Sequence, residues 1–453
     1  MDVERRRLLS VERTEPDEIV AAFAQWDVLP DELRDGGPGA YFVDRRLVEG
    51  HICWVLAPAC GKLPAMKRIF DPVHHFIELA PAEARLLDAP AMQRLRRLRQ
   101  LGLAYLAYPS AEHSRFTHAL GALAMGTRAF DAIAAQGRSF FAGDADVAYQ
   151  RRLLRTALVL HDIGHGPFSH ACEAVLGKHH EERTREIFAL PDLREHIDAL
   201  EVDAADVLAL ILGTETRYPH LRELVSGPNL DADRMDYLLR DAYFTGVQSG
   251  RYDSDQLVAS LRLIEREGAP VLGIDARGVV ALESFVLARY MMFASVYFHH
   301  TTRMFERILQ DVLRELWPDP RALDPIDAFL AWDDFRVLNE LRESRSDAAR
   351  ALRERRRVYK LAAEFNAEQD LSAYEAREAE LRRAYGDENV WADEQSQLLH
   401  RLPLTATEGH PTIWVQTSSG VVDARQASDL IARITGTAYW RKIFVRRGAV
   451  ARA

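Results

Sequence analysis

The stretch HDIGHGPFSH at residues 161–170 decides how this 453-residue sequence is interpreted. It holds three histidines and one aspartate within ten residues. The residues that deliver it, 155–161 (RTALVLH), are apolar enough for a buried helix, and the glycines and proline that follow break a helix. The pattern predicts that His161 and Asp162 lie at the end of a buried helix beside a tight turn. Ionisable groups are costly to bury there unless they are paired or bind a metal.

Two other segments supply side chains of the same kind, RFTH at 115–118 and NLDADRMDY at 229–237. His118 and Asp233 would complete a set of two imidazoles and two carboxylates with His161 and Asp162. Such a set suits a first-row divalent ion, Mn, Fe, Zn or Ni. It also leaves coordination positions open for water and a phosphate oxygen. The alternative interpretation is a hydrogen-bonded cluster in the core without a metal.

Composition and charge narrow the class of protein. With 58 Lys and Arg against 68 Asp and Glu, the net charge of −10 argues against broad coating of nucleic acid. A hydrophobic content of 48% excludes wholesale disorder. The three cysteines (Cys53, Cys60 and Cys172) form neither a disulfide framework nor a zinc ribbon and favour a reducing, cytoplasmic compartment. The N-terminus is too charged for a signal peptide, and we find no run of about 18 apolar residues that would span a membrane.

The chain is predicted to have three parts, as its length suggests at roughly 150 residues per domain. Residues 1–65 form a short N-terminal extension of unknown role, 66–318 a helical core, and 319–453 a smaller α+β subdomain. The fold class is mostly α. Strands are expected at 52–58, 76–79, 412–416 and 442–445. Helices are expected along the stripe from Met92 to Leu101, ended by Gly102, and over 282–313 and 364–385.

These motifs, in this order, resemble the HD-domain phosphohydrolases. RFTH, HDIGHGPFSH, DADRMDYLLRD (231–241), and the upstream DPVHHFIEL (71–79) and DAPAMQRLRRLRQLG (88–102) are most similar to the deoxynucleoside triphosphate triphosphohydrolases. That branch includes the dGTPase-like enzymes and the SAM-and-HD-domain triphosphohydrolase, and the resemblance covers roughly residues 66–310. It implies an HD-domain helical core and metal-dependent hydrolysis of deoxynucleoside triphosphates to deoxynucleoside and tripolyphosphate.

The resemblance also implies roles for individual residues. The divalent metal, with Mg as a second ion carried by the nucleotide, would be held by His118, His161, Asp162 and Asp233. His165 matches a catalytic histidine near the scissile phosphate, and His180 with Glu181 matches a supporting histidine–acid pair. The remaining matches are substrate contacts: Arg115, Arg234 and Arg289 to the triphosphate, Gln100, Leu101, Tyr237 and Asp241 to the deoxyribose, and Tyr297 near the base and sugar.

Members of this branch that form tetramers carry an activator site for a guanine nucleotide. Lys67, Asp88, Gln93 and Arg96 match its contacts, whereas Arg68 and Phe70 depart from it. The resemblance therefore implies GTP or a deoxynucleotide as an activator and a homo-oligomer, from dimer to tetramer or hexamer. The alternative is that the arginines at 94, 96, 97 and 99 form a solvated helix face.

Other interpretations stay open at this stage. The same metal site could serve a phosphodiesterase or nuclease, although nucleic acid is not expected as the main substrate, or a nucleotide sensor that binds without turnover. His170 is expected to be structural. The adjacent pairs His74–His75 and His299–His300 are expected at a surface or interface, and the basic run Arg353–Arg357 on a solvated helix face. No membrane partner is expected.

Overall fold

The computed structural model describes residues 41–48, 51–58, 66–266, 268–366, 370–398, 413–434 and 437–451. The chain divides into two compact units, Met1–Lys67 and Arg68–Ala453. In the first unit, β1 (Tyr41–Val48) and β2 (His51–Pro58) form an antiparallel pair, and β2 contains the strand expected at 52–58. Cys60 lies outside the described residues.

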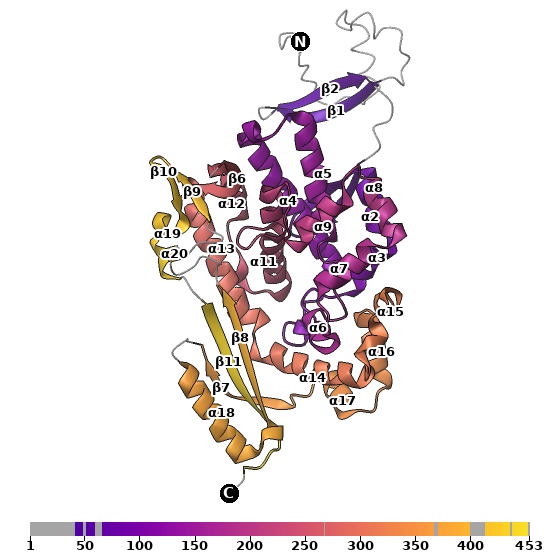
Figure 1. Ribbon diagram of the computed structural model, residues 1–453, viewed down its shortest axis with the longest axis vertical. Helices are drawn as coiled ribbons and strands as arrows, with labels where there is room; N and C mark the ends of the chain where they lie inside the picture. The colour runs from indigo at the N-terminus through magenta and orange to yellow at the C-terminus, as the bar shows by residue number, and fades with distance from the viewer. Residues whose placement is uncertain are drawn as a thin grey trace, which may run out of the picture. The chain divides into compact units, whose positions relative to one another are not determined.

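The second unit is built on α4 (Arg115–Gln136), against which both α5 (Asp144–Leu160) and α11 (Ala232–Thr245) pack (Figure 1). Gly126 of α4 permits this packing, because a Cβ there would lie 2.1 Å from Leu158 Cδ1 and 3.1 Å from Ala232 Cβ. Helix α5 ends directly before His161, as the sequence predicts. The surrounding helices are α2 (Pro81–Asp88), α3 (Pro90–Arg94), α6 (His170–Leu176), α7 (His180–Phe188), α8 (Pro191–Asp198), α9 (Ala204–Leu212), α10 (Pro219–Ser226) and α12 (Ser254–Ser260).

The helix expected from Met92 to Gly102 is wrong. Helix α3 ends at Arg94, a 3-10 turn covers Leu95–Arg97, and Leu98 is already extended with ψ of 117°. An apolar residue at every third position fits the three residues per turn of a 3-10 helix better than the 3.6 of an α-helix. Met92, Leu95 and Leu98 are nevertheless buried, so the spacing correctly indicated the buried face.

The long helix expected over 282–313 is interrupted. Helix α13 (Val279–Met292) continues into a π-helical turn, Phe293–Tyr297, before α14 (His300–Leu316) begins. Such turns are frequent at functional sites, and this one carries Tyr297. The helix Ala276–Tyr297 is long and apolar enough to span a membrane by length and composition, which corrects the sequence-based statement about apolar runs. Of the 18-residue window concerned, 44% is buried within the protein, as in a core helix.

Two small sheets contain the strands of the C-terminal part of the chain (Figure 1). The first has the order β10-β9-β6-β5 and consists of β5 (Leu261–Arg266), β6 (Ala269–Asp275), β9 (Trp414–Thr417) and β10 (Gly420–Asp423). Strands β6 and β9 are parallel. Residues of this region and of the following helices α19 (Ala424–Ala427) and α20 (Asp429–Arg433) join the main apolar core, so the core extends beyond residue 318.

The second sheet is antiparallel, with β11 (Thr437–Arg446) between β7 (Tyr359–Phe365) and β8 (Val390–Leu398), and α18 (Leu371–Tyr385) packs on it. Strands β9 and β11 correspond to the two expected near 412–416 and at 442–445, although residue 412 is not described. The expected helix 364–385 exists only from Leu371. A second apolar cluster gathers α14, α16 (Asp334–Glu343) and α17 (Asp347–Arg353), with α15 (Ile326–Leu330) beside them.

Two further expectations concern local segments. A hairpin of β3 (Lys67–Asp71) and β4 (His75–Leu79) includes the extended stretch expected at 76–79. The run Arg353–Arg357 is exposed but is not a helix face, because α17 ends at Arg353 and Arg355 has a positive φ of 51°. The described part of the chain is mostly helical with small sheets, as the sequence predicts.

Candidate active site

Four side chains expected as metal ligands converge where α4, α11 and the end of α5 meet. The Nε2 atoms of His118 and His161 lie 3.1 Å apart. Asp233 Oδ1 lies 2.9 Å from His118 Nε2 and 3.6 Å from His161 Nε2. Asp162 places Oδ1 3.5 Å from His161 Nε2 and Oδ2 3.9 Å from His118 Nε2. Residues far apart in sequence therefore present their donor atoms to one small volume.

The hydrogen bonds of the His118 and His161 imidazoles determine which ring nitrogens are available to bind a metal. His118 donates Nδ1–H to Asp236 Oδ2 at 2.7 Å, and His161 donates Nδ1–H to the Leu158 carbonyl at 2.7 Å. If both rings are neutral, the two Nε2 lone pairs face each other, and a cation between them, either a proton or a metal ion, relieves that arrangement. Burial lowers the pKa of His118, but its hydrogen bonds to Asp233 and Asp236 outweigh burial and raise it to about 10. This donor set fits a divalent metal.

Asp236 organises the first of these ligands. Besides His118, its carboxylate accepts His74 Nε2 at 2.6 Å and Arg240 Nε and Nη2 at 2.9 and 3.0 Å. Gly121 makes room for it, because a Cβ there would lie 2.0 Å from Asp236 Oδ1. The interpretation of His74 as a surface residue is wrong, since its side chain is 4% exposed.

A second cluster lies beside the first and centres on Glu173, which sequence reasoning missed. Its carboxylate lies 2.9 Å from His180 Nδ1, 3.2 Å from His170 Nδ1 and 3.5 Å from His165 Nδ1. The rings of His165 and His180 stack with centroids 4.1 Å apart. Glu181, the expected acidic partner, is 3.9 Å from His180 Nε2 and half exposed. The spacing of His170 and Glu173, three residues apart on helix α6, was the signal available in the sequence.

The histidines of this cluster differ in exposure and in pKa. Burial and the nearby Arg115 lower the pKa of His165 to about 4, so this ring is neutral at neutral pH. Its Nε2 lies 3.2 Å from Asp162 Oδ1. Burial lowers the pKa of His180, but the hydrogen bond to Glu173 outweighs that effect and raises it. The side chain of His170 is 75% exposed and contacts Glu173 through Nδ1.

The three arginines expected at the triphosphate have different surroundings. Arg115 donates Nη1 to Asp162 Oδ2, and Nε and Nη2 to Ser169 Oγ at 3.0 and 2.6 Å. Arg234 pairs with the Asp231 carboxylate and donates to the Gly227 carbonyl at 2.5 Å. Arg289 is buried with its guanidinium 5.6 Å from the Phe293 ring centroid. Arg115 and Arg234 line the cavity at the metal ligands, and Arg289 does not.

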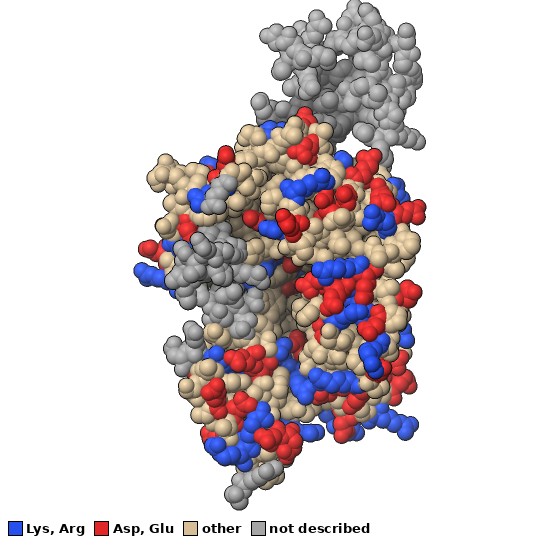
Figure 2. All heavy atoms as spheres, in the orientation of Figure 1, with Lys and Arg blue, Asp and Glu red and all other residues tan. Residues whose placement is uncertain are grey.

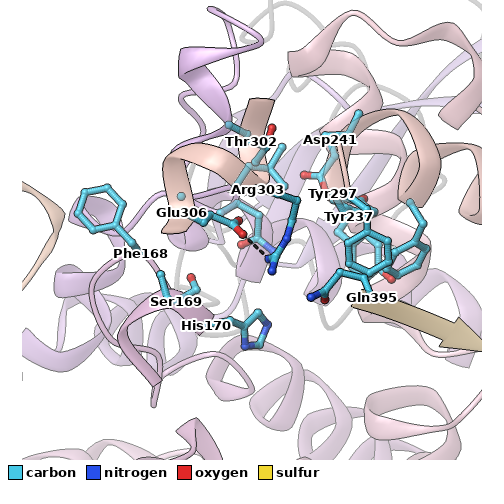
Figure 3. A pocket seen from close by; sticks show the side chains of 18 of the residues that line it. Phe168, Ser169, His170, Tyr237, Asp241, Tyr297, Thr302, Arg303, Glu306 and Gln395 are labelled. Atoms are coloured by element: carbon cyan, nitrogen blue, oxygen red, sulfur yellow. Dashed lines mark hydrogen bonds and ion pairs between the residues drawn. The ribbon is translucent and has the colours of Figure 1, made fainter. Parts of the chain in front are cut away.

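Two cavities meet at this centre. One of about 330 Å³ contains His161, Asp162, His165, His180, Asp233 and Arg234. The other, of about 420 Å³, is drawn in Figure 3. They share four lining residues, namely Gln100, Arg115, His170 and Tyr237, and therefore adjoin.

The larger cavity gathers the residues expected at the sugar and base. Leu101, Tyr237, Asp241 and Tyr297 line it. Asp241 accepts Tyr297 O–H at 2.7 Å and lies 2.7 Å from His113 Nε2. The buried Oε1 of Gln100, which also lines this cavity, has no hydrogen-bond partner among the described residues and can accept one from a ligand.

The turn that ends HDIGHGPFSH is strained, and side chains distant in sequence bind its backbone. Phe168 and Ser169 have positive φ of 53° and 54°. The Phe168 N–H donates to Asp334 at 2.8 Å, and Arg94 donates Nη1 to the His165 carbonyl at 2.7 Å. Arg94 is buried, so the solvated-face interpretation is wrong for this residue. Asp334 was not singled out in the sequence, because it acts through the backbone of a residue distant in sequence.

The residues matched to an activator site lie in and near α2 and α3. Gln93 Nε2 donates to the Leu87 carbonyl at 2.7 Å, and Arg96 Nε donates to Gln93 Oε1 at 2.9 Å. The Arg96 guanidinium lies 3.6 Å from the centroid of the Phe116 ring. Asp88 is exposed at the end of α2, and Lys67 is exposed at the start of β3.

On the face shown in Figure 2, basic and acidic side chains are interspersed. Such a face lacks the continuous basic stripe that is typical of nucleic-acid binding.

Comparisons with known proteins agree on one family. Residues 115–241 match the HD domain, and residues 252–438 match the HD associated region. The uncharacterized protein MJ1154 of Methanocaldococcus jannaschii is 35% identical over 65% of this chain and 59% of its own length. The deoxynucleoside triphosphate triphosphohydrolase SAMHD1 of Gallus gallus is 26% identical over 67% of this chain and 57% of its own. The chain thus spans less than two thirds of either of these curated relatives.

A solved structure extends the similarity over more of the chain. A hypothetical protein from Aquifex aeolicus is 31% identical with a TM-score of 0.68. The match covers 84% of this chain and 97% of that protein.

Proposed function

The chain belongs to the HD-domain family, and from this premise we propose that it is a metal-dependent hydrolase of deoxynucleoside triphosphates. The products would be the deoxynucleoside and tripolyphosphate. One observation carries the proposal: the two histidine Nε2 atoms lie 3.1 Å apart, flanked by two aspartates, at a cavity of about 330 Å³ that adjoins a second cavity of about 420 Å³. A metal centre beside a cavity of that size suits a small ligand that carries phosphate.

His118, His161, Asp162 and Asp233 would hold the metal. When bound, a divalent metal supplies polarisation of a phosphoryl oxygen and lowers the pKa of a coordinated water. Mn, Fe, Zn and Ni all suit this donor set, and Mg would accompany the nucleotide. The protein's part is to fix the ligands, which Asp236 does for His118 and Arg115 does for Asp162.

Arg115 and Arg234 are the cations proposed to neutralise the triphosphate, which carries about four negative charges. Both line the cavity at the metal ligands. The buried Arg289 would act on the substrate only through its field or through a rearrangement.

The proton for the leaving 5′-oxygen is proposed to come from His170. Its Nδ1 lies 3.2 Å from Glu173, which positions the ring, and the exposed side chain lines both cavities. His165, the expected catalytic histidine, is buried with a pKa of about 4 and would serve as a neutral ring that orients Asp162 and the attacking water. His180 would hold Glu173, and Glu181 has no such contact within 3.5 Å of His180.

Selection of the sugar is proposed for the larger cavity. Asp241 and Gln100 offer acceptors for a 3′-hydroxyl, which argues against a chain extended at that position and so against a nuclease. Leu101 and Tyr237 would crowd a 2′-hydroxyl. We further propose a homo-oligomer, and activation by GTP or a deoxynucleotide at Lys67, Asp88, Gln93 and Arg96.

The test is a product assay. The purified protein with Mn²⁺ would receive each of the four deoxynucleoside triphosphates singly, and then mixtures that include GTP, with products separated by chromatography. Deoxynucleoside plus tripolyphosphate is expected, and EDTA should abolish it. Release of monophosphate and pyrophosphate, or cleavage of single-stranded DNA in place of nucleotides, would contradict the proposal. Binding of nucleotides without turnover would favour the sensor.

A further inference from the structure

The larger cavity has one polar wall that the proposed chemistry does not use. Arg303 and Glu306 of α14 and Gln395 of β8 line it, and Figure 3 draws them beside Tyr237 and Tyr297. Strand β8 and helix α14 are brought together behind this wall by Asp393, which is 5% exposed. None of these four residues belongs to the motifs that carry the family resemblance.

Asp393 fixes the arginine of this wall. It accepts Arg303 Nε at 2.9 Å and Nη2 at 2.8 Å, a bidentate pair, and Arg303 Nη1 donates to Glu306 Oε2. Because all three of these guanidinium nitrogens are engaged by carboxylates, Arg303 serves to hold Glu306 in place at the cavity. Two carboxylates around one guanidinium leave the wall with a net negative charge.

Asp393 also sets the orientation of the Gln395 side-chain amide. Gln395 donates Nε2 to Asp393 Oδ1 at 3.1 Å. The Gln395 Oε1 atom, on the other side of the amide, is then left to act as an acceptor. Glu306 and Gln395, which we call the acceptor wall, therefore offer oxygen acceptors to whatever enters the cavity.

The remaining surroundings suit a nucleobase. Tyr237, Phe293, Tyr297 and Phe298 contribute aromatic rings to the cavity, and stacking on such rings is available to every base. Selection among bases must then come from hydrogen bonds. Acceptors are satisfied by the donor groups of a base, and guanine presents two neighbouring donors, N1–H and the 2-amino group. Adenine and cytosine present one amino group, whereas thymine has no amino group and presents only its N3–H as a donor.

We propose that the acceptor wall selects nucleotides whose base carries an amino group and favours guanine over thymine. This inference rests on the proposed function, since it assigns the base end of the same substrate. The negative wall also directs the triphosphate toward Arg115 and Arg234 in the adjoining cavity, because like charges repel.

Calorimetric titration of dGTP and of dTTP into the metal-loaded protein tests this directly, with substitution of Glu306→Gln. Glu315→Gln is the matched control, because Glu315 lies on the same helix α14, is exposed and does not line the cavity. Wild-type protein should bind dGTP at least tenfold more tightly than dTTP. Since a hydrogen bond to a charged group is worth about 1.5 kcal/mol or more, Glu306→Gln should reduce that ratio at least about tenfold, and Glu315→Gln should leave it unchanged.

The outcomes separate this inference from the proposed function. Turnover of all four deoxynucleotides with equal binding of dGTP and dTTP would overturn the acceptor wall and leave the hydrolase intact. Selective binding that persists in Glu306→Gln would also overturn it. Selective binding without turnover would support the wall and contradict the hydrolase. Binding of neither nucleotide overturns both, and thermal denaturation of each variant excludes misfolding as the cause.

Discussion

The carboxylate of Asp334 accepts the backbone N–H of Phe168 at 2.8 Å. Its other oxygen accepts the Arg99 N–H, also at 2.8 Å. Arg99 precedes Gln100, and Phe168 precedes Ser169, the residue that receives two donors of Arg115. One buried side chain from α16 therefore ties together two segments that line the candidate site.

Replacement of Asp334 by alanine should destabilise the protein and disturb both segments. It leaves two buried N–H groups without acceptors at about 1–3 kcal/mol each, so we expect a loss of about 2–5 kcal/mol in the free energy of unfolding. Denaturant titration measures this loss, and Asp347→Ala, at an exposed position on α17, is the control with a change expected near 0.5 kcal/mol or less. A loss below 1 kcal/mol in Asp334→Ala would contradict the assignment.

Substitution of Asp236→Asn should weaken metal binding without removing a ligand. The amide cannot accept from His118 and from Arg240 as the carboxylate does, so the His118 tautomer is no longer fixed. Loss of such a partner typically costs 10–100-fold in metal affinity, which metal titration followed by elemental analysis will measure. Asp255→Asn, at an exposed position, should match wild type. Unchanged affinity in Asp236→Asn would show that the two histidines hold a metal independently of this contact.

His170, the proposed proton donor, and His165, the catalytic histidine expected from the sequence, lead to opposite predictions for Glu173 and Glu181. His170→Ala should lower kcat by about 10²–10⁴-fold with metal content retained. Glu173→Gln should lower kcat as well, because the carboxylate that contacts His170 Nδ1 and positions the ring is lost. Glu181→Gln is the matched control and should leave kcat within about twofold of wild type, because Glu181 is half exposed and 3.9 Å from His180. The reverse ranking of Glu173 and Glu181 would restore the assignment made from sequence.

The sugar selectivity is tested at Leu101. Wild-type protein should hydrolyse dATP and dGTP far faster than ATP and GTP, since Leu101 and Tyr237 line the cavity together. Leu101→Ala should reduce the ratio of kcat/KM for deoxyribonucleotides to kcat/KM for ribonucleotides at least tenfold, because the smaller side chain admits a 2′-hydroxyl. Leu287→Ala, on the exposed side of α13, should not change that ratio. Equal rates on ribonucleotides and deoxyribonucleotides in wild type would contradict the sugar assignment.

Glu223 of α10 gives the protein a pH-dependent stability. Burial raises its pKa to about 7, even though it accepts the Leu272 N–H at 3.2 Å. The unfolded chain releases this proton near pH 4.5 and the folded chain near pH 7, so stability falls as pH rises across that window. The loss is at most about 3 kcal/mol at 1.36 kcal/mol per pKa unit. Glu223→Gln should therefore flatten the decline of Tm between pH 5 and 8, and an identical slope in wild type and variant would contradict this.

Sequence and structure agree most closely where one short motif carries the information. The end of α5 before His161 was predictable because an apolar run met two glycines and a proline within a few residues. Glu173 was harder to recognise, because its role depends on the stacking of His165 on His180, which only the folded chain creates. The contacts of Asp334 were the least predictable, since this side chain binds backbone groups 166 and 235 positions away along the chain.

The break between α13 and α14 is a second feature that the local sequence did not predict. Every residue from 282 to 313 is compatible with a helix, yet a π-helical turn at Phe293–Tyr297 interrupts the pattern. The preference of a segment is local, whereas the position of Tyr297 at the cavity is fixed by its hydrogen bond to Asp241 on α11. Helix propensity therefore predicted the two helices, whereas tertiary packing determines where they are interrupted.

The parallel pairing of β6 with β9 has a consequence during synthesis. Gly273 pairs with Trp414, and Ile431 is fully buried in the same core as Ile274. A ribosome that adds about 5–20 residues per second needs on the order of ten seconds to travel from one strand to the other. Throughout that interval the nascent chain displays an unfinished apolar surface around the catalytic helices. Completion of this apolar core thus waits for the segment from Trp414 to Ile431, and chaperone capture of the growing polypeptide should be strongest just before that segment emerges.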